Sequence, residues 1–196
     1  LRKALPYLTY LTIFGYGFTD KGRLIPPDDR PLIAMAREYG VAPVMLLSSV
    51  TEDGNFNSRR ASMLFNDRAL QDRVLANILA AMEQKGYTGL DIDFEFIPPE
   101  DSGAYLGFLE NAAGKLHSAG YFLHVDLAPK SSDAQKGLLY ESHDYRAIGD
   151  IADSVLLMTY EWGYTYGPPM AVAPINHVRR VAEYGASVID PRKIQL

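Results

Sequence analysis

The chain has 196 residues, of which 47% are hydrophobic, with a formal net charge of −5 and no cysteine. This length allows one domain, residues 1–196, to bury its own core. The acidic balance and the lack of any run rich in Lys and Arg argue against nucleic-acid binding. The absence of cysteine excludes disulfides, thiol catalysis and thiolate metal sites. No apolar run reaches the roughly 20 residues that a membrane-spanning helix needs.

Runs typical of β-strands alternate with helical segments along the chain. The expected strands are 7–18, 41–50, 89–96, 121–128 and 155–162, with a last strand beginning at 193. The expected helices run from Asp28 or Asp29 to Gly40, from Asn66 or Asp67 to Gly86, and over 101–118, 144–151 and 174–184, the last closed by Gly185. A polar loop with Gly54, Asn55 and Asn57 is expected after 50.

This alternation predicts a parallel sheet covered on both faces by helices. The pattern is compatible with a doubly wound sheet and with a (β/α)8 barrel. No Gly-x-Gly-x-x-Gly or P-loop motif follows a strand, which disfavours nucleotide binding.

The most informative stretch is 89–96, Gly-Leu-Asp-Ile-Asp-Phe-Glu-Phe. Strict alternation predicts a strand with Asp91, Asp93 and Glu95 on one face and apolar side chains on the other. Neighbouring carboxylates oppose one another's ionisation, so such a face is costly unless it performs chemistry or binds a cation. A solvated strand face is the ordinary alternative, but parallel strands are usually buried on both sides.

The stretch 87–95 resembles the fourth-strand motif Asp-x-x-Asp-x-Asp-x-Glu of family 18 glycoside hydrolases, and Met158-Thr159-Tyr160-Glu161 resembles the Met-x-Tyr element of that family's sixth strand. Phe94 with the following 97–101, and Ala128-Pro129-Lys130, look closest to the bacterial spore-cortex N-acetylglucosaminidase branch. The first Asp of the motif is replaced by Thr88, which removes an expected buried partner of the next acid.

The resemblance implies hydrolysis of β-1,4-linked N-acetylglucosamine polymers, either peptidoglycan of the spore cortex or chitin, without a metal or other cofactor. It implies Glu95 as general acid/base with a raised pKa, Asp93 as the group that orients the substrate acetamide, Asp91 as the residue that tunes Asp93, and Tyr160 as a donor to the acetamide oxygen. It also implies a location at the cell envelope, in the spore or outside the cell. The segment at 1–6 is too short for a signal peptide.

Further candidates for substrate binding are aromatic or polar residues near strand ends, namely Trp162, Tyr16, Met158 and Asp126. Phe14, Phe18, Tyr164 and Tyr166 belong to the same aromatic clusters, for which packing is the alternative role. For Asp126, the alternative is a buried hydrogen bond. His117, His143 and His177 are expected at the surface.

By motif, the chain covers strands two to six and the start of strand seven, so the expected fold is an incomplete (β/α)8 barrel of TIM type. Five strands cannot close a barrel, and we expect another segment or chain to complete it. Two other functions stay open at this point: a non-catalytic protein that binds N-acetylglucosamine polymers, and a metal-dependent hydrolase that uses Asp91, Asp93 and Glu95 as ligands.

Overall fold

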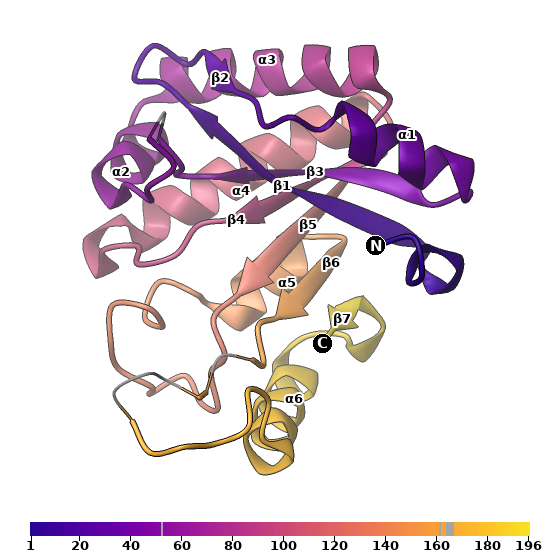
Figure 1. The fold of residues 1–196 in the computed structure, drawn as a ribbon. Coiled ribbons are helices and arrows are strands. Elements are labelled where there is room, and N and C mark those ends of the chain that lie inside the picture. The colour runs from indigo at the N-terminus through magenta and orange to yellow at the C-terminus, as the bar shows by residue number, and fades with distance from the viewer. Residues whose placement is uncertain (52, 161, 164–166) are drawn as a thin grey trace.

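The computed structural model describes residues 1–51, 53–160, 162–163 and 167–196. They form a seven-stranded sheet and its covering helices (Figure 1). In chain order the elements are β1 (Tyr10–Phe18), β2 (Leu24–Ile25), α1 (Arg30–Glu38), β3 (Ala42–Ser48), α2 (Ser58–Asn66), α3 (Arg68–Lys85), β4 (Gly89–Asp93), α4 (Ser102–Ser118), β5 (Phe122–Leu127), α5 (Tyr145–Ile151), β6 (Ser154–Leu157), α6 (Ile175–Val188) and β7 (Ile194–Gln195).

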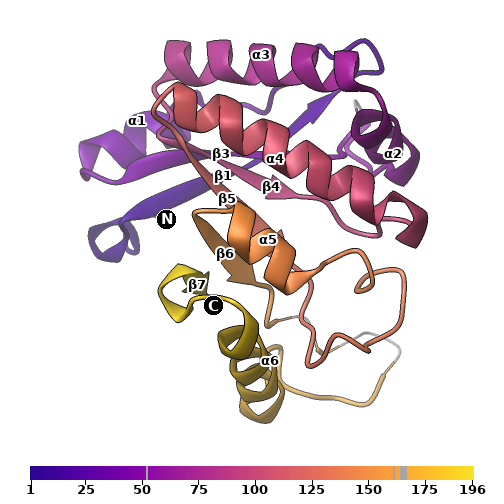
Figure 2. The ribbon, with the colours of Figure 1, turned by 180° about the vertical axis from the view of Figure 1, so that it is seen from behind.

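The strand order is β2-β1-β3-β4-β5-β6-β7. β2 is a short antiparallel addition to β1, and every other neighbouring pair is parallel. Because each right-handed crossover advances to the next strand in the same direction, the helices gather on one face of the sheet. Accordingly, α4 and α5 lie in front of the sheet in Figure 2 and behind it in Figure 1. This arrangement corrects the expectation that helices cover both faces, and it excludes a doubly wound sheet.

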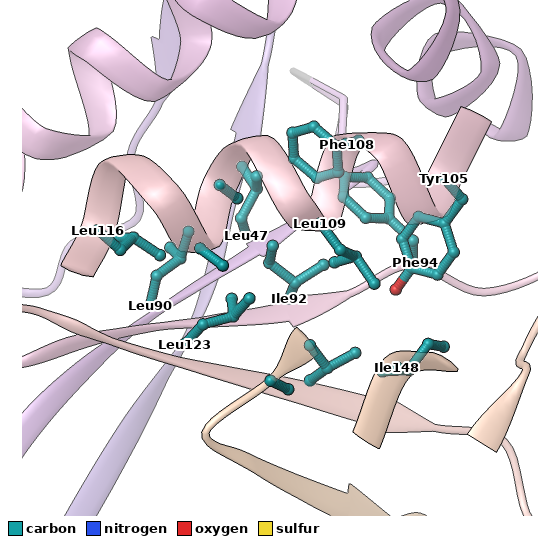
Figure 3. Close-up of a cluster of buried hydrophobic side chains, with 14 of the residues drawn as sticks. Leu47, Leu90, Ile92, Phe94, Tyr105, Phe108, Leu109, Leu116, Leu123 and Ile148 are labelled. Atoms are coloured by element: carbon teal, nitrogen blue, oxygen red, sulfur yellow. The ribbon is translucent and has the colours of Figure 1, made fainter. Parts of the chain in front are cut away.

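The main core lies between the sheet and α4 (Figure 3). Leu90 and Ile92 of β4 point toward α4, where Phe108, Leu109 and Leu116 meet them. Each of these five side chains is at most 1% exposed. Complete burial of Leu, Ile or Phe stabilises a fold by roughly 1.5–3 kcal/mol per side chain relative to exposure. The apolar half of the β4 alternation therefore anchors the strand.

The other half of the alternation is also buried. Asp91 is 3% exposed and Asp93 is 6% exposed, on the face of β4 turned away from α4. This burial rules out the alternative of a solvated strand face.

Helix ends follow the capping residues that the sequence indicated. Asp67 accepts a hydrogen bond from the Leu70 N–H at 3.0 Å at the start of α3. Gly86 ends the same helix with a φ of 70°, in the left-handed region where glycine is favoured. Asp29 stands at the N-terminus of α1, as expected.

The expected polar loop after 50 contains a helix that the sequence reading missed. Asn57 caps α2 by accepting a hydrogen bond from the Arg60 N–H at 3.0 Å. Ala61, Leu64 and Phe65 are buried along one side of this helix. An Asn followed by apolar residues at helical spacing was the available signal.

Three of the element ends that differ from expectation bear on the site or on the packing. β4 ends at Asp93 and β6 ends at Leu157, so Glu95 and Tyr160 lie beyond their strands. Helix α6 continues past Gly185 to Val188. A Cβ at Gly185 would lie 2.8 Å from the Leu157 side chain, so this glycine serves close packing rather than helix termination.

Among the helices of the described residues, none is both long enough and apolar enough to cross a membrane.

Gly17 of β1 approaches a neighbouring backbone closely. An added Cβ would lie 2.0 Å from the carbonyl oxygen of Val50. Because this oxygen belongs to the backbone, the clash could not be relieved by the movement of a flexible side chain. We expect Gly17→Ala to lower the free energy of unfolding by about 1–3 kcal/mol. Gly114→Ala in α4, where a Cβ meets nothing within 4 Å, is the matched control and should raise it by roughly 0.5–1 kcal/mol. Urea titration of both variants measures the difference, and equal effects would contradict the close approach.

Candidate active site

The acidic segment reaches the carboxyl-terminal edge of the sheet. Asp91 and Asp93 lie within β4, whereas Glu95 follows its end. Phe96 adopts a φ of 53°, and its side chain is 46% exposed instead of continuing the buried apolar face. Glu95 thus lies just past the end of β4, at the edge where parallel α/β enzymes hold their catalytic groups.

A cavity of about 730 Å³ opens at this edge. We call it the acidic cavity; it is lined by Phe14, Leu46, Phe56, Asp93, Glu95, Phe96, Asp126, Pro129, Leu139, Tyr140, Met158, Tyr160 and Trp162. Six of the eight predicted site residues are among them: Asp93, Glu95, Asp126, Met158, Tyr160 and Trp162. Its volume is in the range of ligand pockets, roughly 300–1,000 Å³.

The buried acids of the sheet hold protons unusually tightly. Burial raises the pKa of Asp93 to about 7, and the charge of Glu95 contributes to this shift. Burial and the charge of Asp93 likewise raise the pKa of Asp91, against a hydrogen bond from Thr12 that lowers it. Burial also raises the pKa of Asp126, which faces the same three acids. The group therefore shares protons near neutral pH and is suited to proton transfer. A raised pKa of Glu95 stays a prediction.

Asp91 lies below the acidic cavity and forms a second cluster with His124 and Asp126. One ligand atom from each of the three lies within 4.8 Å of the others. Burial lowers the pKa of His124 to about 4, so its imidazole is neutral and can act as a ligand. Within the described part of the chain, these three residues are the group whose ligand atoms lie close enough together to hold one metal ion. Neither Asp93 nor Glu95 belongs to the group. It differs from the ligand set Asp91, Asp93 and Glu95 that the sequence left open.

Tyr16 is not at the cavity, contrary to expectation. Its side chain is 1% exposed, and its hydroxyl donates to Asp29 and accepts from Nζ of Lys85 at 2.6 Å. The pairing of β1 with β3 shifts register between Ile13 and Tyr16. A one-residue shift moves a side chain to the other face of the sheet. Tyr16 therefore joins the helix-covered core instead of the cavity.

Phe14, which lies inside that irregular interval of β1, lines the acidic cavity beside Phe56, with ring centroids 6.3 Å apart. Trp162 lines it as well, and its ring stacks on His177 at 5.4 Å. Phe18 is instead buried against Phe94 in the core. Glu161, Tyr164 and Tyr166 lie outside the described residues.

His143 is 1% exposed, which corrects its expected surface position. Its Nδ1 accepts a hydrogen bond from the Ala128 N–H at 2.9 Å, so Nε2 carries the proton and donates to the Phe94 carbonyl at 3.1 Å. Burial lowers the pKa of His143 to about 4, which keeps this neutral form at physiological pH. His143 thereby joins the chain just before Glu95 to the chain just after Asp126. The sequence carried no periodic signal for this contact.

Neighbouring residues extend this link. The Tyr145 hydroxyl donates to the Ala128 carbonyl at 2.6 Å and accepts from the Lys130 N–H at 2.9 Å. The Ser142 hydroxyl donates to the Ile97 carbonyl at 2.9 Å. We call His143, Tyr145 and Ser142 the loop bracket, because together they join the segments that follow β4 and β5.

Thr88, at the first position of the acidic motif, is exposed and donates from its hydroxyl to the Pro43 carbonyl at 2.9 Å. Thr12 of β1 is the hydroxyl that lowers the pKa of Asp91. The hydrogen-bond partner of Asp91 that the motif would place at position 88 is thus supplied by Thr12 of β1.

Carboxylates gathered toward the carboxyl-terminal ends of parallel strands, on a sheet whose other face carries helices, are the arrangement of the (β/α)-barrel class of enzymes. The family model of the glycosyl hydrolases family 18 matches residues 44–193. The chain belongs to this family.

Curated relatives include the cortical fragment-lytic enzyme of Bacillus anthracis, 40% identical over 97% of this chain and 44% of its own length. The enzyme of the same name from Bacillus subtilis (strain 168) is 39% identical over 98% of this chain and 44% of its own length. The chain thus spans less than half the length of these relatives.

Solved structures of the same fold include enzymes of this kind. The spore cortex-lytic enzyme SleL of Bacillus cereus matches with a TM-score of 0.93 and 38% identity, over 99% of this chain and 45% of that one. A chitinase from Chromobacterium violaceum matches with a TM-score of 0.89 at 20% identity, over 98% of this chain and 61% of that one, and shows a shared fold.

The raised pKa of Asp93 has a consequence for stability. Between its unfolded pKa of about 3.9 and its folded pKa of about 7, the native state holds a proton that the unfolded state releases, so the protein loses stability as pH rises through this window. Asp93→Asn removes this cost, and at pH 8 we expect it to raise the free energy of unfolding by about 1–3 kcal/mol. Below pH 4 the two proteins should be nearly equal. Urea titrations at both pH values measure this, with the exposed Asp150→Asn as control; a pH-independent difference would contradict it.

Loss of His143 should disturb the loop bracket. We expect His143→Phe to lower the free energy of unfolding by about 2–4 kcal/mol, because it leaves two buried backbone groups unpaired. His143→Gln keeps a donor and an acceptor and should retain part of the stability. Hydrogen exchange at the Ala128 amide gives a direct readout, and unchanged protection in His143→Phe would show that the link does not hold the segment.

Proposed function

We propose that this chain carries the catalytic centre of a hydrolase acting on β-1,4-linked N-acetylglucosamine polymers through a substrate-assisted, retaining mechanism. The observation that carries the proposal is the convergence of Glu95, Asp93 and Tyr160 on one cavity. Three different positions in the sequence, two of them beyond their strand ends, supply the groups that such a reaction requires.

In the first step, Glu95 gives its proton to the glycosidic oxygen while the bond from that oxygen to C1 breaks. The carbonyl oxygen of the substrate's own acetamide attacks C1 and forms a cyclic oxazolinium ion. In the second step, water attacks C1 and reopens the ring, and Glu95 takes back the proton from that water. Configuration at C1 is retained, and no other co-reactant is needed.

Asp93 accepts a hydrogen bond from the acetamide N–H, which holds the acetamide in position for attack. With a pKa of about 7, Asp93 is partly ionised near neutral pH, and its carboxylate form accepts this hydrogen bond and balances the positive charge that develops on the nitrogen of the oxazolinium ion. Asp91 tunes Asp93 from below; in support of this role, the charge of Asp93 helps to raise the pKa of Asp91, so the two carboxyl groups interact. The Tyr160 hydroxyl donates to the acetamide oxygen.

Spore-cortex peptidoglycan is the favoured substrate over chitin, because relatives about 40% identical carry names that refer to the cortex. The site of action is the spore, the cell envelope or the exterior of the cell. The fold is part of a (β/α)8 barrel, and further strands complete it between β7 and the opposite edge of the sheet, where β2 pairs with the end of β1.

The test compares the unaltered protein with Glu95→Gln, each with and without EDTA, on reporter-linked chitobiose and on muropeptide glycans. Glu100→Gln, an exposed position five residues further along, is the matched control. We expect EDTA-resistant hydrolysis that falls at least 1,000-fold in Glu95→Gln, an order of magnitude typical of a lost acid/base group, and is unchanged in Glu100→Gln.

Activity abolished by EDTA would instead favour the cluster of Asp91, His124 and Asp126 as a metal centre. Equal glycan binding by both proteins without any turnover would overturn hydrolysis by this chain and identify it as a binding protein.

A further inference from the structure

A second hollow of about 140 Å³ adjoins the acidic cavity. The two share Pro129, Tyr140 and Trp162 as lining residues. We call this hollow the side pocket; its remaining lining residues are Ser131, Gln135, His177, Arg180 and Val181. It lies between the segment after β5 and the first two turns of α6.

The two hollows carry opposite charge. The charged side chains lining the acidic cavity are the carboxylates Asp93, Glu95 and Asp126. In the side pocket the charged lining residue is the guanidinium of Arg180. Within the described part of the chain, neither Asp nor Glu lines the side pocket. A substrate that extends from the acidic cavity into the side pocket would therefore meet carboxylates at one end and a guanidinium at the other.

The Arg180–His177 contact determines which groups the side pocket presents. Nη2 of Arg180 lies 2.7 Å from Nδ1 of His177. A guanidinium only donates, so Nδ1 accepts and the proton of the neutral imidazole is on Nε2. His177 is held in place by its stack against Trp162. The pair thus offers hydrogen-bond donors beside Trp162, whose ring also lines the acidic cavity.

Gln135 adds donors of the same kind. Its Oε1 accepts from the Ser131 N–H at 2.9 Å and from the Ser131 hydroxyl at 3.2 Å. Both contacts occupy the oxygen, so the remaining amide N–H groups are left to donate.

Helix α6 reinforces the preference for an anion. Arg180 and His177 lie within its first two turns, and the first turn contains no acidic residue. The N-terminus of a helix carries a partial positive charge, which favours nearby anions. Asp133, on the neighbouring loop, accepts a hydrogen bond from Tyr184 on a later turn of the helix.

We propose that the side pocket binds a carboxylate carried by the glycan in the acidic cavity, through Arg180, His177 and Gln135. A volume of about 140 Å³ admits a carboxylate with its adjoining carbons, since one water occupies roughly 30 Å³. This deepens and rests on the proposed function: it makes the preferred substrate a glycan with lactyl or peptide acids, as in peptidoglycan, rather than neutral chitin.

The test measures binding in the Glu95→Gln background, so that the result does not depend on turnover. The probes are a muramyl-peptide glycan with free carboxylates, the same glycan with these groups converted to methylamides, and a chitin oligomer of equal length. Arg180→Gln removes the positive charge and places an amide hydrogen-bond donor there instead of the guanidinium. Arg179→Gln, the adjacent exposed arginine outside the side pocket, is the matched control.

We expect Arg180→Gln to weaken binding of the free-acid glycan by about tenfold or more, since hydrogen bonds to charged groups are the strong ones. Its binding of the methylamide glycan and the chitin oligomer should change less than twofold, and Arg179→Gln should leave all three unchanged. No preference of the parent for the free acid, or an equal loss for all three probes in Arg180→Gln, would overturn the assignment, whether or not any polymer is hydrolysed.

Discussion

The packing of one short strand supports the rest of the site. Leu90 and Ile92 are fixed beneath α4, and this places Asp91 and Asp93 on the opposite face, where they are nearly as buried. Bringing like-charged groups out of water is unfavourable unless protons neutralise part of the charge. The raised pKa values of these two acids express that cost. The apolar side of β4 thus contributes the stability with which the protein holds reactive carboxylates in place.

A fixed strand alone does not position Glu95, because that residue lies beyond the strand end. His143 supplies the missing constraint by accepting from the Ala128 N–H and donating to the Phe94 carbonyl. The imidazole can do both only in its neutral form, which burial favours. The rigidity of the cavity rim therefore depends on a buried histidine that does not itself line the cavity.

Charge is distributed unevenly around this rim. Carboxylates face the acidic cavity, whereas Arg180 faces the adjoining side pocket, and the stacked rings of Trp162 and His177 lie between them. Charged groups of opposite sign in neighbouring hollows discriminate between ligands mainly by favouring one orientation and disfavouring the reverse. The same arrangement that permits proton transfer at one point thus offers recognition of an anion at another.

Local patterns in the sequence were sufficient for most of the elements, though not for α2, and for the acidic residues of β4. The alternation in 89–96 predicted the strand and its carboxylate face, and Asp67 and Gly86 marked the ends of α3, because these features depend on neighbours along the chain. The positions of Tyr16 and His143 were decided only by tertiary structure. A register shift between β1 and β3 places the Tyr16 side chain in the core. Hydrogen bonds from the His143 imidazole to two distant backbone groups, the Ala128 N–H and the Phe94 carbonyl, hold His143 in the interior. No periodicity records such contacts, because their energy comes from residues far apart in the sequence that become neighbours only after folding.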